Sequence, residues 1–114
     1  MRTTTSMLLL LLSAFVTNAQ NILSGIYRTG ENNTKIEIKE NGGVYSGIVI
    51  ASDKAERGIL ILKDITPIGG EWKGQLFSAK KKKWYKAVLK REEDQLLITV
   101  NAGIAKRTVR WSRE

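Results

Sequence analysis

The chain contains no cysteine, no histidine and a single proline among its 114 residues. The lack of histidine excludes a Ser-His-Asp triad, histidine acid–base catalysis and histidine-ligated metal. The lack of cysteine excludes thiol nucleophiles, disulfides, iron–sulfur centres and cysteine-ligated zinc. These absences predict a protein that is not an enzyme, binds no metal or cofactor, and is held together by its core alone.

The long apolar run of the sequence lies near the N-terminus. The basic residue Arg2 precedes the run MLLLLLSAFV at residues 7–16, and the small residue Ala19 follows it. This order is typical of a secretory signal peptide at residues 1–19, and the run is shorter than the roughly 20 apolar residues of a membrane-spanning helix. The alternative is a buried N-terminal helix, but the contiguous leucines have no amphipathic period. We therefore expect export to the periplasm or the cell exterior and a soluble mature protein.

Cleavage after Ala19 would leave residues 20–114, which is enough chain for one small domain. Lys and Arg outnumber Asp and Glu by 19 to 11, so the net charge is +8. Arg2 is the one charged residue before the cleavage position, so the mature net charge would be +7. The predicted domain is therefore basic.

After residue 20 the sequence consists of short alternating runs separated by turn residues. Ile36 and Ile38 alternate with charged residues, which is the period of a half-buried strand. Residues 41–43 (NGG) supply the positive φ of a tight hairpin turn, and Pro67 together with residues 69–70 (GG) predicts a further break. On this reasoning eight strands are predicted, at residues 24–29, 34–40, 44–51, 58–64, 71–78, 84–91, 95–100 and 104–113.

Eight sequential antiparallel strands joined by tight turns favour an up-and-down β-barrel, because closure leaves no strand edge exposed. Gly47 and Gly74 lie inside two of the runs, where a glycine permits the bend that closure requires. A two-sheet sandwich is the alternative, although its Greek-key crossovers need longer connections. We predict an all-β fold, an eight-stranded antiparallel up-and-down barrel.

Segments across residues 24–114 match a known pattern. The more specific ones surround Trp72 (EWKGQL, residues 71–76) and Trp111 (RTVRWSR, residues 107–113), and GVYSGIV at residues 43–49 agrees as well. On these segments the chain resembles the bacterial domain-of-unknown-function 2147 family, small exported proteins with a lipocalin-like barrel. That family usually has tryptophan where Tyr27 stands, and its Asp-Pro turn is replaced here by SAKKKK at residues 78–83. Because the family has no established activity, the resemblance implies fold and export and leaves function open.

Aromatic residues form the first candidate binding site. An eight-stranded barrel can hold one small ligand, and aromatic side chains at its mouth would contact an apolar or amphipathic molecule. The alternative is that these side chains fill the core, since the strands are short and the interior is small. The predicted contacts are Tyr27, Tyr45, Trp72, Tyr85 and Trp111.

A basic cluster at residues 80–91 forms the second candidate. Such a surface attracts anionic lipid or acidic polysaccharide, whereas nucleic acid is not expected as the partner of an exported protein. The alternative is a solvated loop that keeps the protein soluble. Trp84 is expected outside the barrel, and Arg107, Arg110 and Arg113 would join the same surface if the barrel closes. The predicted contacts are Lys80, Lys81, Lys82, Lys83, Lys86, Lys90 and Arg91.

These candidates lead to two expectations for function. The first is a non-catalytic binding module for a small apolar or amphipathic ligand. The second is an envelope or surface protein that binds an anionic component through residues 80–91. The carboxylates of Glu92, Glu93 and Asp94 fall in one predicted turn, and nothing in the sequence places two of them across a cleft, as glycoside hydrolysis requires.

Overall fold

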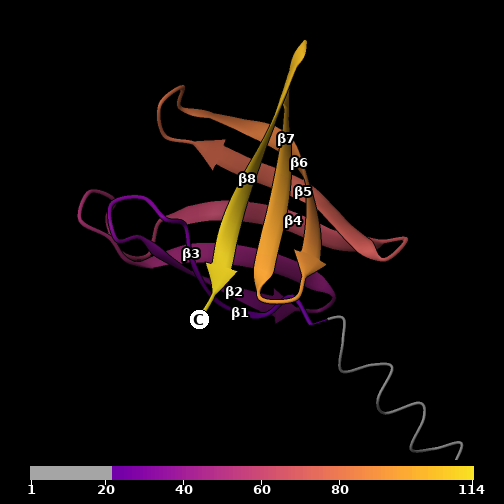
Figure 1. The fold of residues 1–114 in the computed structure, drawn as a ribbon, viewed down its shortest axis with the longest axis horizontal. Helices are drawn as coiled ribbons and strands as arrows, with labels where there is room; N and C mark the ends of the chain where they lie inside the picture. The colour runs from indigo at the N-terminus through magenta and orange to yellow at the C-terminus, as the bar shows by residue number, and fades with distance from the viewer. Residues whose placement is uncertain (1–21) are drawn as a thin grey trace, which may run out of the picture.

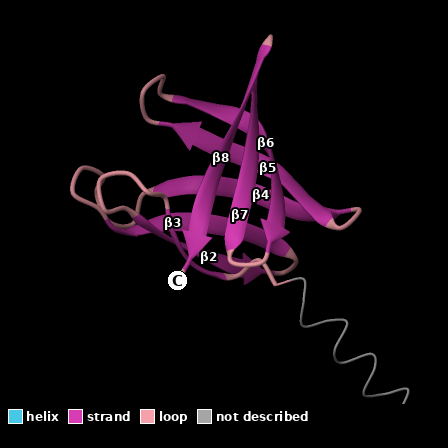
Figure 2. Cartoon of the chain, in the orientation of Figure 1, coloured by secondary structure: helices cyan, strands magenta, loops and turns pink. Residues whose placement is uncertain are grey.

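The computed structural model describes residues 22–114, and within them the chain forms a closed antiparallel barrel (Figure 1). Each strand pairs with the next along the chain, and the last pairs back with the first. The predicted all-β up-and-down barrel of eight strands is therefore confirmed (Figure 2). The predicted signal peptide at residues 1–19 lies outside the described residues. The strands are β1 (Gly25–Arg28), β2 (Lys35–Asn41), β3 (Val44–Ala51), β4 (Leu60–Ile68), β5 (Glu71–Ser78), β6 (Lys83–Glu92), β7 (Gln95–Ala102) and β8 (Ala105–Arg113).

Pro67 does not break the chain as predicted, because it lies inside β4 and pairs with Trp72 of β5. The ladder between β3 and β4 ends at the pair Tyr45 and Ile65. Pro67 lies beyond that point, where β4 no longer pairs with β3. On that side no neighbouring strand needs an N–H donor from residue 67, so proline is tolerated there. The turn between β4 and β5 is formed by the two glycines at residues 69–70 alone.

The barrel interior is filled by the apolar half of each alternating strand. Ile36 and Ile38 of β2 are buried as their period predicted, and the same alternation buries residues of β6 and β7. Among the described residues, no polar or charged residue is buried. The core consists of Leu23, Tyr27, Ile36, Ile38, Val49, Leu62, Ile65, Trp72, Ala87, Leu89, Leu96, Ile98 and Trp111.

The two glycines within strands allow close approach of neighbouring strands. A Cβ on Gly74 would overlap the Cδ1 of Ile65 and lie 2.8 Å from the carbonyl oxygen of Lys63. A Cβ on Gly47 would lie 3.1 Å from the Cβ of Leu62, which is a milder contact. Glycine is therefore required at position 74 because β4 packs directly over it, at an irregularity of the β4–β5 ladder.

The segment that precedes β1 closes one end of the barrel. Leu23 is fully buried, and its carbonyl oxygen accepts a hydrogen bond of 2.7 Å from the Tyr27 hydroxyl. Two arginines fasten the neighbouring backbone: Arg91 donates to the carbonyl of Ile22, and Arg113 donates to the carbonyl of Ser24. This end of the barrel is thus plugged by the chain itself.

The barrel closes through a short contact. β1 pairs with β8 at two positions only, Tyr27 with Arg113 and Arg28 with Ser112. The hairpin of β7 and β8 continues well past this contact and projects beyond β1 and β2 (Figure 1). In the part of the chain that the structure describes, residues 105–110 of β8 therefore have a strand neighbour on one side, β7.

Candidate functional site

Of the five aromatic residues predicted to contact a ligand, Tyr27, Trp72 and Trp111 belong to the core and Tyr45 packs against it. Trp72 and Trp111 are 4% and 5% exposed and Tyr27 is fully buried, while Tyr45 and Tyr85 are half-buried. The placement of these four is what core filling requires, and Leu23 plugs the end of the barrel next to Tyr27. A role for these residues in binding an apolar ligand stays a prediction.

The residues of the predicted basic cluster divide among three environments. Residues 80–82 lie in the turn between β5 and β6, and Lys83 begins β6. Lys86 and Lys90 are exposed on the outer face of β6. Arg91 belongs to the other face, where it donates to the carbonyls of Ile22 and Glu93. The cluster is therefore not one continuous surface, and Arg91 stabilises the plugged end of the barrel.

The strand register brings together a set of residues that the sequence does not place side by side. Along one line across five strands, β4 to β8, the paired residues are Lys63 with Gln75, Gln75 with Lys86, Lys86 with Asn101, and Asn101 with Lys106. Directly paired residues in antiparallel strands have their side chains on the same face, and Lys86, Asn101 and Lys106 are exposed. We call these five residues the lysine–amide row, because lysine and amide side chains alternate along it.

The lysine–amide row follows the floor of a groove on the outside of the barrel. The groove has a volume of about 780 Å³, and four of the five row residues line it. A second line of paired residues, Lys73 with Val88 and Val88 with Thr99, runs beside the first. The outer groove thus contains three lysines against one aspartate, with amides and hydroxyls between them. Its lining is Asp64, Thr66, Lys73, Gly74, Gln75, Trp84, Lys86, Ala87, Val88, Thr99, Asn101 and Lys106.

Trp84 provides the aromatic surface of the outer groove. Its side chain is half-buried and packs against Phe77 across the β5–β6 pair, with ring centroids 5.3 Å apart and planes tilted by 58°. The ammonium of Lys63 lies 4.3 Å from the centre of the Trp84 ring, within the range of a cation–π contact. This contact places the first lysine of the row beside Trp84, which itself lines the groove.

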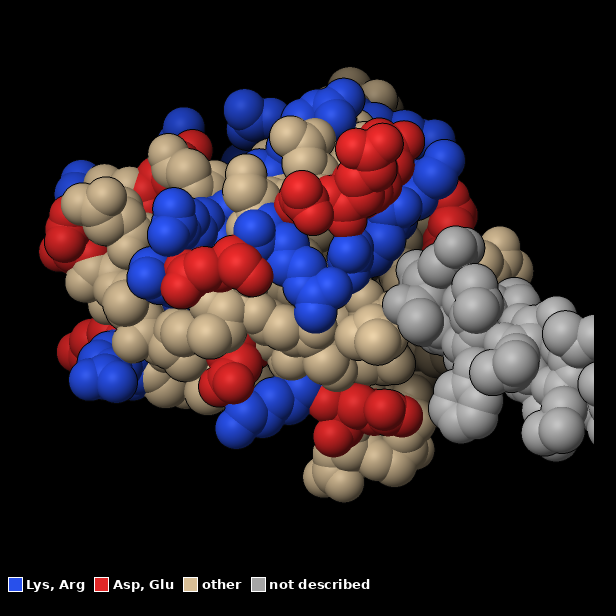
Figure 3. Space-filling view, turned by 60° about the horizontal axis from the view of Figure 1, so that its bottom comes forward, with Lys and Arg blue, Asp and Glu red and all other residues tan. Residues whose placement is uncertain are grey.

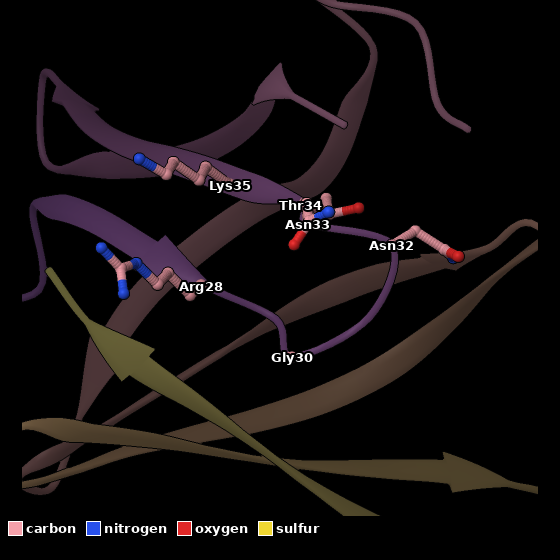
Figure 4. A pocket seen from close by; sticks show the side chains of 6 residues that line it. All are labelled: Arg28, Gly30, Asn32, Asn33, Thr34 and Lys35. Carbon is pink, nitrogen blue, oxygen red and sulfur yellow. The ribbon is translucent and has the colours of Figure 1, made fainter. Parts of the chain in front are cut away.

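A second hollow, of about 370 Å³, lies at the turn between β1 and β2 (Figure 4). Its two basic side chains, Arg28 and Lys35, point in the same direction and both contact the carboxylate of Glu114, at 3.2 Å and 3.0 Å. Hydrogen bonds from Lys35 and Arg28 lower the pKa of Glu114 below its ordinary value. Because these cations already have an anionic partner, the hollow is a weaker candidate for binding an anion than the outer groove.

The remaining charged surface is mixed. Figure 3 shows one face on which acidic and basic side chains alternate, so the net positive charge does not form a uniform layer there. The acidic residues of the β6–β7 turn line a third hollow with Gln95. Within residues 22–114, no group of three or more metal-ligating side chains is placed to hold a metal ion. No helix in this part of the chain has the length and apolar character needed to cross a membrane.

The sequence pattern pointed to Lys86 and Trp84 as surface residues but not to Lys63, Lys73 and Lys106 as members of the same site. These three lie on β4, β5 and β8, and each is unremarkable in its own strand. Outward-facing lysines on successive strands were the available signal, because the alternation of each strand shows which residues face out. The alignment of those lysines depends on the register of four strand pairs, including the irregular β4–β5 ladder.

No protein-family model matches the chain, and no curated protein or solved structure matches it significantly. Membership of the domain-of-unknown-function 2147 family therefore stays a prediction from the segments around Trp72 and Trp111.

Proposed function

We propose that this protein is a non-catalytic binding module whose outer groove holds a linear acidic polysaccharide. The observation that carries the proposal is the lysine–amide row, in which Lys63, Lys86 and Lys106 are separated by Gln75 and Asn101. Lysines attract carboxylates or sulfates, and the amides between them suit the hydroxyl groups of a sugar. The aromatic surface of Trp84 adds an apolar contact for a sugar ring.

The spacing of the row favours a polymer with a regular charge repeat. Neighbouring strands lie about 4.8 Å apart, so lysines on every second strand are separated by about 9–10 Å. This separation is comparable to the charge repeat of a linear polysaccharide that has one acid in every two sugars. The bound chain would cross the strands along the row, with an acid at each lysine and neutral groups at each amide.

An anionic lipid surface is less well matched by this groove. A lipid surface presents charge over a plane, whereas the row is a line of cations, two of which, Lys86 and Lys106, line a hollow. Export, which would bring the protein to envelope or extracellular polysaccharides, rests on the predicted signal at residues 1–19, outside the described residues.

The test compares two variants that remove the same charge. In the row variant Lys63, Lys86 and Lys106 are replaced by Gln, and in the turn variant Lys80, Lys81 and Lys82 are replaced by Gln. The probe is a hyaluronan octasaccharide, with a dextran oligosaccharide as the neutral control, and affinity is measured by isothermal titration calorimetry. We expect the row variant to bind at least about tenfold more weakly, because charge-assisted hydrogen bonds contribute roughly 1.5–3 kcal/mol each.

We expect the turn variant to retain binding within a small factor, and wild-type binding to weaken with added salt. Equal losses in both variants would show attraction by net charge alone and would contradict a built site. Binding that survives in the row variant, or that dextran matches, would also overturn the proposal.

A further inference from the structure

One edge of the barrel is open along part of β8. Within the described residues, β8 pairs with β1 through Ser112 and Arg113, and β1 ends at Arg28. After Arg28 the chain turns away from β8, so the β1–β2 turn does not cover the preceding part of that strand (Figure 4). Residues 105–110 are all exposed, and among residues 22–114 they pair with β7 alone. We call their free side the β8 edge.

The hydrogen bonds near the end of β8 show which backbone groups face this edge. The Arg113 amide donates to the carbonyl of Asp94 on the β7 side, and the Glu114 amide donates to the carbonyl of Ile26 on the β1 side. In an antiparallel ladder the N–H and C=O groups of successive residues alternate in direction. By this alternation the backbone groups of residues 106, 108 and 110 face the β8 edge, whereas those of residues 105, 107 and 109 bond to β7.

The β8 edge is basic. Lys106, Arg107 and Arg110 lie along it, and the sequence from Gln95 to Arg113 contains no aspartate or glutamate. These charges disfavour pairing with a second copy. If two such edges met antiparallel about Thr108, Lys106 of each copy would lie opposite Arg110 of the other, and like charges directly opposite are destabilising.

We propose that the β8 edge binds an extended acidic segment of a partner protein by strand addition. In this mode backbone hydrogen bonds hold the added strand and alternate side chains give specificity. The segment would occupy the line that β1 leaves at Arg28 and would bond residues 106, 108 and 110. Carboxylates on its outer face would contact Lys106 and Arg110.

The inner face of the added strand calls for a mixed sequence. Val109 is paired with the buried Ile98, so its side chain is on the inner face, yet it is 38% exposed. Apolar residues of the segment would cover Val109 on the inner face, while its acidic residues lie on the outer face beside Lys106 and Arg110. The partner segment is therefore expected to alternate acidic with apolar residues, as an extended strand.

The test uses a blocked seven-residue peptide in which glutamate and valine alternate, and it measures amide hydrogen exchange residue by residue by NMR. We expect the peptide to slow exchange at the amides of Lys106, Thr108 and Arg110 and to leave Arg107 and Val109 unchanged, since these already bond to β7. Binding without this alternating protection would overturn strand addition. Concentration-dependent protection of the same amides without peptide would show a second copy as the occupant and would also overturn the proposal.

Two matched changes separate backbone pairing from charge attraction. Thr108→Pro removes one edge N–H, and proline is tolerated where the N–H of an edge strand faces solvent, so we expect about tenfold weaker peptide binding. Lys86→Gln removes a cation from the groove and should leave peptide binding unchanged. If Thr108→Pro fails to fold, the same peptide N-methylated at alternate residues is tested on the wild-type protein, because N-methylation removes the backbone N–H groups that strand addition uses. Undiminished binding of this peptide would contradict the proposal. Lys106 belongs to both sites, but Lys86→Gln changes the outer groove without changing the β8 edge, and Thr108→Pro changes the β8 edge without removing a row residue. Weaker polysaccharide binding in Lys86→Gln and weaker peptide binding in Thr108→Pro are therefore separate results.

Discussion

The Tyr27 hydroxyl donates a hydrogen bond of 2.7 Å to the carbonyl oxygen of Leu23, and both residues are fully buried. The bond turns the segment before β1 back across the end of the barrel, where Leu23 fills the opening. Arg91 and Arg113 bind the backbone on either side of Leu23. The sequence suggested Tyr27 as a ligand contact, but its hydroxyl, the one polar group of the side chain, is used in a hydrogen bond that stabilises the fold.

Replacing Tyr27 with phenylalanine tests this contact. The change leaves the buried carbonyl of Leu23 without its donor, and an unsatisfied buried group costs about 1–3 kcal/mol. We expect Tyr27→Phe to lower the free energy of unfolding by that amount in urea denaturation. Tyr45→Phe, at a half-buried position, is the control and should change stability by less. Equal losses in the two variants would contradict a special role for the Tyr27 hydroxyl.

Stability should also depend on the ionisation of Tyr27. Burial raises the pKa of this phenol above its ordinary value of 10.0, although the nearby charges of Arg91 and Arg113 oppose the shift. Above pH 10 the unfolded chain loses this proton more readily than the folded one, so stability falls as the pH rises through the folded-state pKa. Urea denaturation at several pH values should show a smaller fall for Tyr27→Phe than for wild type. An identical fall in both proteins would contradict a contribution from the Tyr27 phenol.

The two strand glycines should differ in their tolerance of alanine. A Cβ at position 74 would collide with Ile65 and with the backbone of β4, whereas a Cβ at position 47 meets side chains at 3.1–3.2 Å that can shift. Overpacking of a core costs typically 1–3 kcal/mol, and we expect Gly74→Ala to reach or exceed the upper value. Gly47→Ala should cost less. Thermal unfolding of the pair measures the difference, and the reverse order would be inconsistent with the close approach of β4 to Gly74.

Arg91 and Lys86 should separate stability from binding. Arg91→Gln removes the hydrogen bonds to the carbonyls of Ile22 and Glu93, so we expect a loss of about 1–3 kcal/mol in stability and unchanged affinity for hyaluronan. Lys86→Gln should weaken hyaluronan binding and leave stability within about 0.5 kcal/mol. Urea denaturation and calorimetry on both variants measure the two quantities. A loss of hyaluronan affinity in Arg91→Gln would show that Arg91 contributes to the binding surface after all.

The alternation of apolar and polar residues predicted the fold, because in a meander barrel each strand by itself shows which of its residues face inward and which face outward. Ile36 and Ile38 show this for β2. Pro67 was assigned wrongly to a break because its acceptable position in β4 depends on where the ladder with β3 ends, which is a tertiary property. Alternation could also have separated Arg91 from Lys86 and Lys90, since Arg91 shares its face with Leu89. The lysine–amide row could not be predicted from the sequence. Its residues face one another only in the observed register of four strand pairs, and a shift of one residue in any of these pairs would move them apart.

The two-position contact between β1 and β8 also bears on the order in which the barrel assembles. Every other strand pair joins neighbours in sequence and closes a short loop, whereas Arg28 and Ser112 come from opposite ends of the described chain. Closing a long-range contact has the larger cost in conformational entropy. Here only a few backbone hydrogen bonds between β1 and β8 offset that cost. The hairpins are therefore expected to form first and the seam between β1 and β8 last. We expect the native barrel to open most readily at the same seam, which would leave an eight-stranded sheet still paired along its other seven contacts.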